Sequence, residues 1–515
     1  MSKSGISMLV AALAAGASFA ALADGNSVAL RADAKNIKYD PMIFGSFLEH
    51  FDNQVYGGVF DPKSPLADAD GFRKDVIDAL RKIKLPVVRW PGGCFVSAYH
   101  WQDGVGPNRE PTYDKAWFVE EPNTFGTDEY VKWCRKVGCE PYICTNAGTG
   151  TPEEMSDWVE YCNQTMGKFA KMRERNGHKE PYNIKYWSVG NENWGGHETG
   201  AKTVGEWGPL VRESAKMMRA ADIRTKLLAA ATPNERWTLP LLREAGGLLD
   251  YVCIHHYGQI LAVKYNPTDY LGAMMLTDNA ENNIRAVRGI LDKARLGGGR
   301  VKIAYDEWNL RGWHHPWHGD FRRGMDVGAR RRNDTHSTYT MADAVYTACQ
   351  LNSFMRNGDI VGMACFAPVV NTTGFIFVHE KGIVKRTTYH VYDMYVNGLL
   401  PEVAPCTVEC ERLNGWRANT GMIDAVVTTD AKRSAYRIAI CNKSPDAAQK
   451  VRIDLASLGK SAPAKVKARM LVGDSKDAFN SPENPDRVVP AEAELAVADG
   501  CVEIPAHTMA ILAVD

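Results

Sequence analysis

The sequence predicts an α/β fold, a (β/α)8 TIM barrel followed by a C-terminal all-β sandwich domain. Short β-rich segments alternate with amphipathic helical segments along most of the chain, which is typical of parallel strands joined by helices. After about residue 400 the pattern changes to short alternating runs separated by Gly, Pro, Asn and Asp. A length of 515 residues also exceeds one typical domain.

Eight β-rich segments match the strand number of a closed barrel. Helical patterns lie between them, such as Phe72–Lys84 and Thr127–Gly138, the second opened by a Thr cap and closed by Gly. An open, doubly wound sheet is the alternative, but no G-x-G-x-x-G motif follows the first strand. The predicted barrel strands are Met42–Phe47, Pro86–Trp90, Glu140–Thr145, Ile184–Val189, Leu227–Ala231, Tyr251–His255, Val301–Tyr305 and Ile360–Phe366.

Composition divides the chain into four parts. Residues 1–23 are expected to be a signal peptide, residues 24–40 an N-terminal strand that joins the sandwich, residues 41–399 the barrel and residues 400–515 the sandwich. A final helix, Thr387–Leu399, closes the barrel region. The sandwich strands are expected at Ser27–Arg31, Ala425–Thr429, Ala435–Cys441, Val451–Leu455 and Met509–Val514.

The N-terminus has the parts of a secretory signal. Lys3 precedes an apolar stretch from Ile6 to Leu22, and Ala23 ends an A-x-A cleavage site before Asp24. An uncleaved membrane anchor is the alternative. No later segment approaches the run of about eighteen apolar residues that a membrane span needs. We therefore expect an exported protein, periplasmic or extracellular, with no membrane association after cleavage.

The charge balance argues against a polyanionic partner. Lys+Arg and Asp+Glu are equal at 61 each, so no net field attracts nucleic acid or an anionic membrane, and a neutral ligand fits better. The 13 Trp and 20 Tyr either fill the core or form platforms for sugar rings. Most of the 12 cysteines sit in apolar patterns, so we expect buried thiols, with Cys406 and Cys410 as the candidates for a bridge.

Two glutamates stand at matching strand ends. Glu192 follows the predicted strand Ile184–Val189, and Glu307 follows Val301–Tyr305. They are roughly 115 residues apart, or about three strand–helix units, which assigns them to the fourth and seventh strands. Across a narrow barrel those strand ends face each other, at the end where such barrels carry their active sites.

A pair of facing carboxylates can hydrolyse an acetal. One carboxyl group protonates the leaving oxygen; when the two are ~5–5.5 Å apart, the other is a nucleophile and configuration is retained. The acid must keep its proton near neutral pH, so burial and the neighbouring negative charge should raise its pKa. The structural alternative is that each glutamate only caps a helix or pairs with an arginine.

A set of segments adds specificity to this interpretation: Gly45–His50, Val88–Cys94, Tyr99–Pro107, Gly190–Trp194, Tyr305–Asn309 and Gly382–His390. Together they resemble the α-L-arabinofuranosidases of glycoside hydrolase family 51, and the resemblance runs from about Phe44 to Tyr395. It implies an exo-acting, retaining hydrolase that releases terminal α-L-arabinofuranosyl groups from arabinan- or arabinoxylan-type chains. Glu192 would be the general acid/base and Glu307 the nucleophile. The resemblance also implies a homo-oligomer, and no cofactor is expected.

By the same resemblance, four more residues belong to the sugar site. Glu49 accepts a sugar hydroxyl, Asn191 binds the 2-hydroxyl, His255 reaches the acid/base, and the Tyr257 hydroxyl orients the nucleophile. Each has a plainer alternative: a salt bridge for Glu49, a strand-end hydrogen bond for Asn191, and packing for the other two. His256, between them, is expected to point elsewhere.

Arg89 and two departures from the family pattern complete the predicted pocket. Arg89, on the second strand, could hold one of the acids in a bidentate grip or form an ion pair that only fixes the barrel. Cys94 stands where many relatives have a sugar-contacting Asn, and Pro368 where many have a Gln near the leaving group. Cys94 can still contact the sugar through its backbone or sulfur. The departures affect substrate identity and leave the carboxylate chemistry intact.

No metal site is expected from the sequence. The cluster Trp313–His318 lacks the i, i+4 spacing of a helical histidine pair, and it is interpreted as a loop that contacts substrate. Arg330–Arg332 is interpreted as a solvated face or a subunit contact. The alternative functions are a β-xylosidase or endo-glucanase on the same scaffold, and a carbohydrate-binding protein that has lost catalysis.

Overall fold

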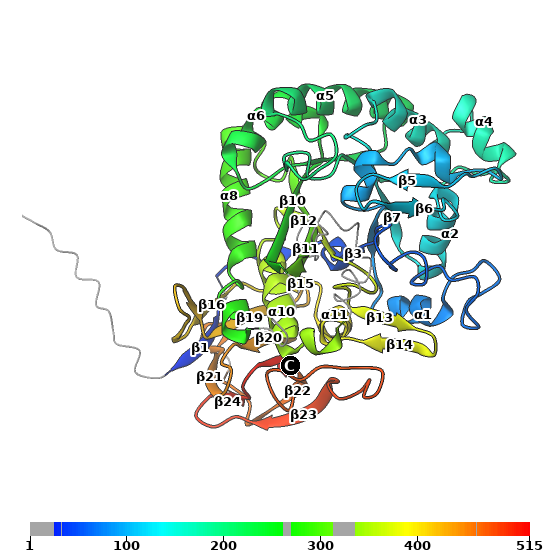
Figure 1. The fold of residues 1–515 in the computed structure, drawn as a ribbon. Coiled ribbons are helices and arrows are strands. Elements are labelled where there is room, and N and C mark those ends of the chain that lie inside the picture. Colours follow the sequence, from blue (N-terminus) through cyan, green and yellow to red (C-terminus); the bar gives the residue numbers. More distant parts are fainter. Residues whose placement is uncertain (1–24, 32, 261–268, 313–334, 460, 515) are drawn as a thin grey trace, which may run out of the picture.

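A closed barrel of eight parallel strands forms the centre of the molecule (Figure 1). The computed structural model describes residues 25–31, 33–260, 269–312, 335–459 and 461–514. The last barrel strand pairs with the first, which closes the sheet and confirms all eight predicted strands. In chain order these are β3 (Gly45–Phe47), β4 (Val87–Trp90), β7 (Glu140–Thr145), β8 (Tyr186–Val189), β9 (Lys226–Ala230), β10 (Tyr251–Ile260), β11 (Lys302–Gly312) and β12 (Val361–Phe366).

Helices lie on the outside of the barrel and bury their apolar faces against it. Prediction placed the N-cap of the second helix at Thr127, but the cap is Gly126, whose N–H donates to the Glu129 side chain. No helix in the described part of the chain combines the length and apolarity of a membrane span. The helices are α1 (Lys74–Lys82), α2 (Thr127–Val137), α3 (Pro152–Asn163), α4 (Lys168–Arg175), α5 (Val204–Ala221), α6 (Glu235–Ala245), α7 (Tyr270–Met274), α8 (Asn279–Lys293), α10 (Met341–Arg356) and α11 (Thr387–Gly398).

Two packed sheets form the C-terminal sandwich, coloured yellow through orange to red in Figure 1 except for its blue N-terminal strands. The N-terminal strand β1 (Asn26–Leu30) lies between β16 (Cys406–Glu409) and β21 (Gln449–Asp454), as predicted for this segment. The smaller sheet is completed by β24 (Cys501–Ile504). The larger one contains β2 (Ile37–Lys38), β15 (Glu402–Val403), β19 (Ile423–Thr429), β20 (Tyr436–Asn442), β25 (Thr508–Val514), β22 (Lys465–Leu471) and β23 (Ala491–Ala496).

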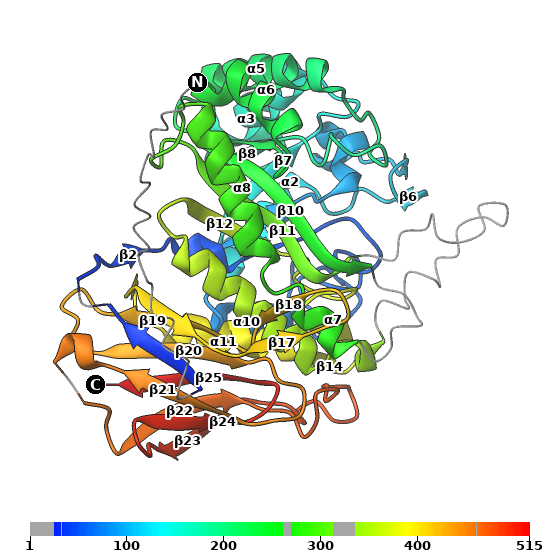
Figure 2. The same ribbon diagram turned by 90° about the vertical axis from the view of Figure 1, so that its left-hand side faces the viewer.

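Helices α10 and α11 join the sandwich to the barrel (Figure 2). Residues 341–355 of α10 are all buried, because one side of this helix faces the barrel and the other contacts β19, β20 and β25. At its C-terminus, Arg356 lies 3.2 Å from Asp424 on β19, and Asn352 donates to the same carboxylate at 2.6 Å. Polar groups inside this apolar contact therefore fix how the two parts meet.

The cysteines are free thiols throughout the structure. Cys406 and Cys410, the candidates for a bridge, are both half-buried and unbridged, and the Cys410 thiol lies 3.5 Å from the carbonyl oxygen of Ile423. Eight of the others are buried. Packing therefore accounts for most cysteines, as their apolar surroundings in the sequence indicated.

Replacing Asp424 by Ala should destabilise the junction between barrel and sandwich. The change removes the nearer carboxylate partner of Arg356 and the acceptor of the Asn352 amide, which should lower the free energy of unfolding by about 3 kcal/mol. Guanidinium unfolding followed by tryptophan fluorescence would measure it. Lys465→Ala is the control: its ion pair with Glu494 is exposed, so its loss should cost less than about 1 kcal/mol. Equal effects of both changes would contradict the role given to Asp424.

Candidate active site

The site lies where the barrel strands end, and two irregular strands shape it. Pairing between β11 and β12 shifts between Tyr305 and Trp308, and pairing between β10 and β11 shifts near His255. Neighbouring residues of a regular strand point to opposite faces. The irregularity allows both Asp306 and Glu307 to reach buried partners inside the barrel. The predicted strand ended at Tyr305, whereas β11 continues through Glu307 to Gly312.

A single guanidinium connects the acidic groups of the site. Arg89, on β4, lies 2.7 Å from Glu307 Oε2 and 3.3 Å from Asp306 Oδ2, and it donates to Asn191 Oδ1 at 2.5 Å. The prediction of a bidentate grip on one acid was wrong, because the nitrogens of Arg89 are divided among these three groups and the sulfur of Cys144, 3.6 Å away. The Tyr142 hydroxyl donates a hydrogen bond of 2.7 Å to the same oxygen of Asp306, Oδ2.

Glu307 is held from two directions. Arg89 binds Oε2, and the Tyr257 hydroxyl donates to Oε1 at 2.7 Å, which is the contact predicted for that tyrosine. His255 Nδ1 lies 3.5 Å from Oε2. With 3% exposure, the carboxylate has a fixed orientation inside the barrel. His256 bonds instead to Asn279, so it points away as expected.

Glu192 lies between two histidines. Its Oε1 is 2.9 Å from His255 Nδ1, and its Oε2 is 2.8 Å from His197 Nε2. The backbone of Glu192 is left-handed, with φ 41°, a conformation that a non-glycine residue adopts at some cost and that here turns the side chain into the site. One oxygen each of Glu192 and Glu307 and a nitrogen of His255 all lie within 4.8 Å of one another.

The protonation of Glu192 differs from the prediction. Burial alone would raise its pKa, but hydrogen bonds from His197 and His255 outweigh burial and hold the pKa of Glu192 below its usual range. Burial would lower the pKa of His255, and the negative charges of Glu307 and Asp306 instead raise it to about 10. In the free enzyme the shared proton therefore resides on the histidines, next to the carboxylate.

Glu49 is fully buried, and one of its two carboxyl oxygens has no hydrogen-bond partner among the described residues. The Trp117 indole and the Phe95 N–H donate to its Oε1, while no group in the described structure bonds Oε2. Burial and then the charge of Glu307 raise the pKa of Glu49 to about 8. Glu49 is therefore protonated at neutral pH and can donate a hydrogen bond as well as accept one.

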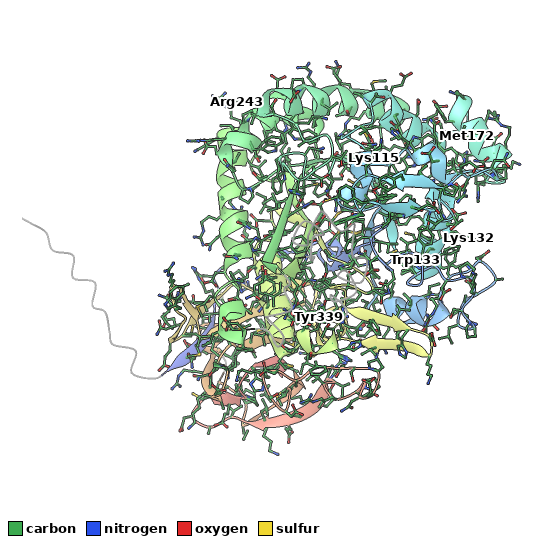
Figure 3. The ribbon with its side chains drawn as sticks, viewed as in Figure 1. Lys115, Lys132, Trp133, Met172, Arg243 and Tyr339 are labelled. Carbon is green, nitrogen blue, oxygen red and sulfur yellow. The ribbon has the colours of Figure 1, made fainter. Side chains whose placement is uncertain are left out.

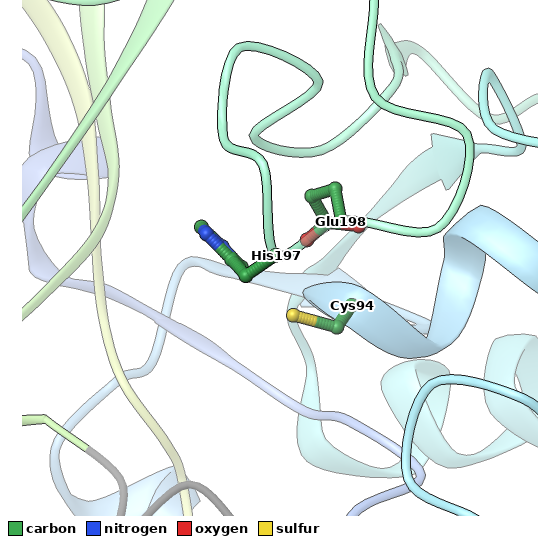
Figure 4. A group of neighbouring side chains, drawn as sticks. All are labelled: Cys94, His197 and Glu198. Atoms are coloured by element: carbon green, nitrogen blue, oxygen red, sulfur yellow. The ribbon is translucent and has the colours of Figure 1, made fainter. Parts of the chain in front are cut away.

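Cys94 belongs to a group that sequence reasoning missed (Figure 4). Its sulfur lies within 4.8 Å of a Glu198 carboxylate oxygen, and the two oxygens of Glu198 accept from Asn191 and Ser97, each at 2.7 Å. Glu198 therefore ties two predicted sugar contacts together. The signal was weak, because His197 and Glu198 follow Glu192 in a loop with no regular spacing.

A cavity of about 260 Å³ opens beside this group. Cys94, His197 and Glu198 form one wall, and Lys115 and Phe118 lie on the other. Figure 3 labels Lys115, on the loop between β5 (Thr112–Asp114) and β6 (Val119–Glu121). Pro368 is buried just after β12. The predicted loop residues Trp313–His318 and Arg330–Arg332 lie outside the described part of the chain, as do the signal-peptide residues 1–23.

Comparison with known proteins gives a consistent result. Residues 79–274 match the model of the α-L-arabinofuranosidase 1 domain, and residues 306–508 match the α-L-arabinofuranosidase C-terminal domain. A probable α-L-arabinofuranosidase C from Aspergillus clavatus is 34% identical over 94% of this chain and 96% of its own length. The chain belongs to the α-L-arabinofuranosidase family.

Two further relatives agree with this family and place it among the family 51 hydrolases. An intracellular exo-α-(1→5)-L-arabinofuranosidase from Acetivibrio thermocellus is 35% identical over 68% of this chain and 71% of its own length. The solved family 51 α-L-arabinofuranosidase from Thermotoga petrophila is 31% identical, with a TM-score of 0.82 over 95% of this chain and 100% of that one. The family 51 barrel and sandwich are thus shared along the whole length.

The raised pKa of His255 gives a prediction for this family 51 site. Because the ring should stay protonated, its 13C-labelled Cε1 signal should not titrate between about pH 6 and 8, where an unperturbed histidine does. Asp306→Asn removes one of the charges responsible and should move the midpoint down toward this range. NMR titration would test it, with His255→Gln for assignment. A wild-type titration midpoint at about pH 6.5 would show that Glu307 and Asp306 do not raise the pKa of His255.

Proposed function

We propose that this protein is a retaining, exo-acting α-L-arabinofuranosidase with Glu192 as general acid/base and Glu307 as nucleophile. The observation that carries the proposal is the approach of the two carboxylates, within 4.8 Å, at the end of the barrel. Retaining glycosidases place their carboxyl groups ~5–5.5 Å apart, whereas inverting ones need ~6.5–9.5 Å to hold a water between them. Family membership supports the arabinofuranosyl substrate and the exo action.

In the first step, a Glu307 oxygen attacks the anomeric carbon and the bond to the leaving oxygen breaks. Arg89 and Tyr257 keep the attacking carboxylate aimed, which reduces the entropic cost of the reaction. Glu192 takes a proton from His255 along the 2.9 Å hydrogen bond and delivers it to the leaving oxygen, which leaves Glu192 as an anion beside a neutral His255. The low resting pKa of Glu192 is then compatible with acid catalysis, because the proton is one hydrogen bond away.

In the second step, water attacks the same carbon and releases the sugar from Glu307. Glu192, still an anion, accepts the proton of that water as a general base and returns it to His255. Loss of the Glu307 charge in the covalent intermediate weakens the field that keeps His255 protonated. The net change is hydrolysis of one glycosidic bond, with both glutamates returned to their first state and configuration retained.

The sugar itself would be bound by groups around this pair. Asn191, fixed by Arg89 and Glu198, presents its amide next to Glu192. Glu49 offers its spare oxygen from the opposite wall, beside the backbone of Gly93. Hydrogen bonds of this kind strengthen in the transition state and supply several kcal/mol. Cys94 would contact the sugar through its backbone or sulfur.

A β-xylosidase or an endo-glucanase would use the same carboxylates, because loops decide which sugar fits. Parallel assays with nitrophenyl α-L-arabinofuranoside, β-D-xyloside and β-D-glucoside distinguish these activities. We expect turnover of the arabinofuranoside to dominate, and its absence would refute the proposed substrate. A carbohydrate-binding protein without catalysis would turn over none of the three.

Azide distinguishes the two glutamates. In Glu192→Ala the missing acid slows poor leaving groups, but a dinitrophenyl arabinofuranoside still forms the covalent intermediate, which azide should capture as the α-azide. In Glu307→Gly azide replaces the nucleophile, so the β-azide should form. Without azide, Glu307→Gly should lower kcat/KM by about 10³-fold or more for every substrate, whereas Glu192→Ala should do so only for substrates with poor leaving groups. NMR of the products gives the anomeric configuration.

Glu198→Gln is the matched control for the azide experiment, since it alters a neighbouring acid that neither attacks nor protonates. It should lower turnover modestly and yield no glycosyl azide. If Glu192→Ala gave the β-azide, or Glu307→Gly the α-azide, the assigned roles would be reversed. If neither variant gave an azide, the covalent mechanism would be wrong.

We also propose that the protein is exported and cleaved after Ala23, and that it forms a homo-oligomer. The support is the signal-like sequence at the N-terminus. Intact-mass measurement of protein from the native host should give a chain beginning at Asp24; a mass that includes residues 1–23 would refute cleavage. Light scattering of the same sample reports the subunit number.

A further inference from the structure

The group at the mouth of the site has the chemistry of a metal-binding site. We propose that Cys94, His197 and Glu198 bind a soft divalent cation, with zinc as the best match, and that the bound ion inhibits the enzyme. The three residues supply sulfur, nitrogen and oxygen, the donor atoms that zinc takes in proteins. Binding of the ion does not depend on the catalytic roles proposed above, whereas its inhibitory effect rests on the proposed role of Glu192.

The geometry brings the three donors together from two separate segments (Figure 4). Cys94 begins the short 3-10 helix after β4, and His197 and Glu198 lie in the loop after β8. Their ligand atoms all lie within 4.8 Å of one another. Tetrahedral zinc ligands are about 3.5 Å apart, so small side-chain rotations bring them into range.

The most buried ligand is already oriented. Glu198 is 5% exposed, and hydrogen bonds from Asn191 and Ser97, both 2.7 Å, fix its two oxygens. Outer partners of this kind hold ligands in place in metal sites, and their loss typically costs 10–100-fold in affinity. Cys94 is half-buried, and the side chain of His197 is 38% exposed, so an ion can reach both from solvent.

The site also has room to complete the coordination shell. The cavity beside it measures about 260 Å³, enough for the ion and water. Three protein ligands with a fourth, open position are typical of accessible zinc sites. On binding, the metal replaces the thiol proton of Cys94, which passes to solvent.

A second cluster, Glu192, His255 and Glu307, also brings its donors within 4.8 Å, but it suits a soft cation less well. It contains no sulfur, and the guanidinium of Arg89 already occupies Glu307 at 2.7 Å. Thiolate and imidazole select zinc, cadmium or cobalt over magnesium and calcium, which prefer oxygen alone. The softer ions should therefore choose the cluster that contains Cys94.

Occupation of this site would interfere with catalysis directly. His197 Nε2 is 2.8 Å from Glu192 Oε2, so a cation on His197 lies next to the carboxylate that must meet the leaving oxygen. Zinc should therefore compete with substrate, and a chelator should restore activity.

Titration with Co²⁺ tests the site without using turnover. Tetrahedral cobalt bound to a thiolate gives a near-ultraviolet charge-transfer band and visible ligand-field bands. We expect one equivalent in the intact protein, displaced by Zn²⁺ and unaffected by Mg²⁺. Cys94→Ser should remove the charge-transfer band, and the exposed His197→Ala, chosen as a change that should not disturb folding, should weaken binding at least about tenfold.

Two controls locate the ion. Cys410→Ser removes a half-buried thiol of the sandwich and should leave the spectrum unchanged. Glu307→Gln alters the competing cluster and should also leave it unchanged. The proposal is overturned if no thiolate band forms, if the band survives Cys94→Ser, or if Glu307→Gln abolishes it. Since the spectrum needs no turnover, these results stand even if the proposed hydrolase activity proves wrong.

Discussion

The buried guanidinium of Arg89 is the constraint on which the active end of the barrel depends. Asp306 and Glu307 are adjacent in sequence and almost fully enclosed, and two unpaired carboxylates at such depth would cost several kcal/mol each. Arg89 contacts both and also holds Asn191. One positive side chain thus compensates the charge of the proposed nucleophile, Glu307, and orients the amide of Asn191, so the structural and chemical requirements cannot be separated there.

His255 is a second positively charged group that compensates the charge of these acids. It lies between Glu192, Asp306 and Glu307, and the charge of these acids is what keeps its ring protonated. The proposed acid/base is therefore a unit made of the Glu192 carboxylate and its neighbouring imidazoles. Its protonation depends on the charge of Glu307, which in the proposed mechanism is lost and regained during each turnover. A coupled group of this kind titrates as a whole, and no single residue sets its behaviour.

Much of the fold could be predicted from sequence because periodicity and strand number depend on local pattern. All eight barrel strands and the N-terminal strand of the sandwich were found, and the expected partners of Tyr257 and His255 lie where they were placed. The shift in pairing near Glu307 could not be seen, because a bulge depends on the neighbouring strand. The low pKa of Glu192 was missed for a related reason: His197 reaches it from an irregular loop.

The position of β1 has a consequence for how the chain is made. This strand comes from the beginning of the sequence, yet it lies between β16 and β21, which come from its last quarter, and buries Val28 in their shared core. The smaller sheet cannot close until nearly the whole polypeptide has been synthesised. Strand β1 therefore has no partner strand while the barrel, which lies between β1 and β16 in the sequence, is synthesised. Completion of the sandwich is thus a late event that joins the two ends of the molecule, and a truncated chain would leave both ends open.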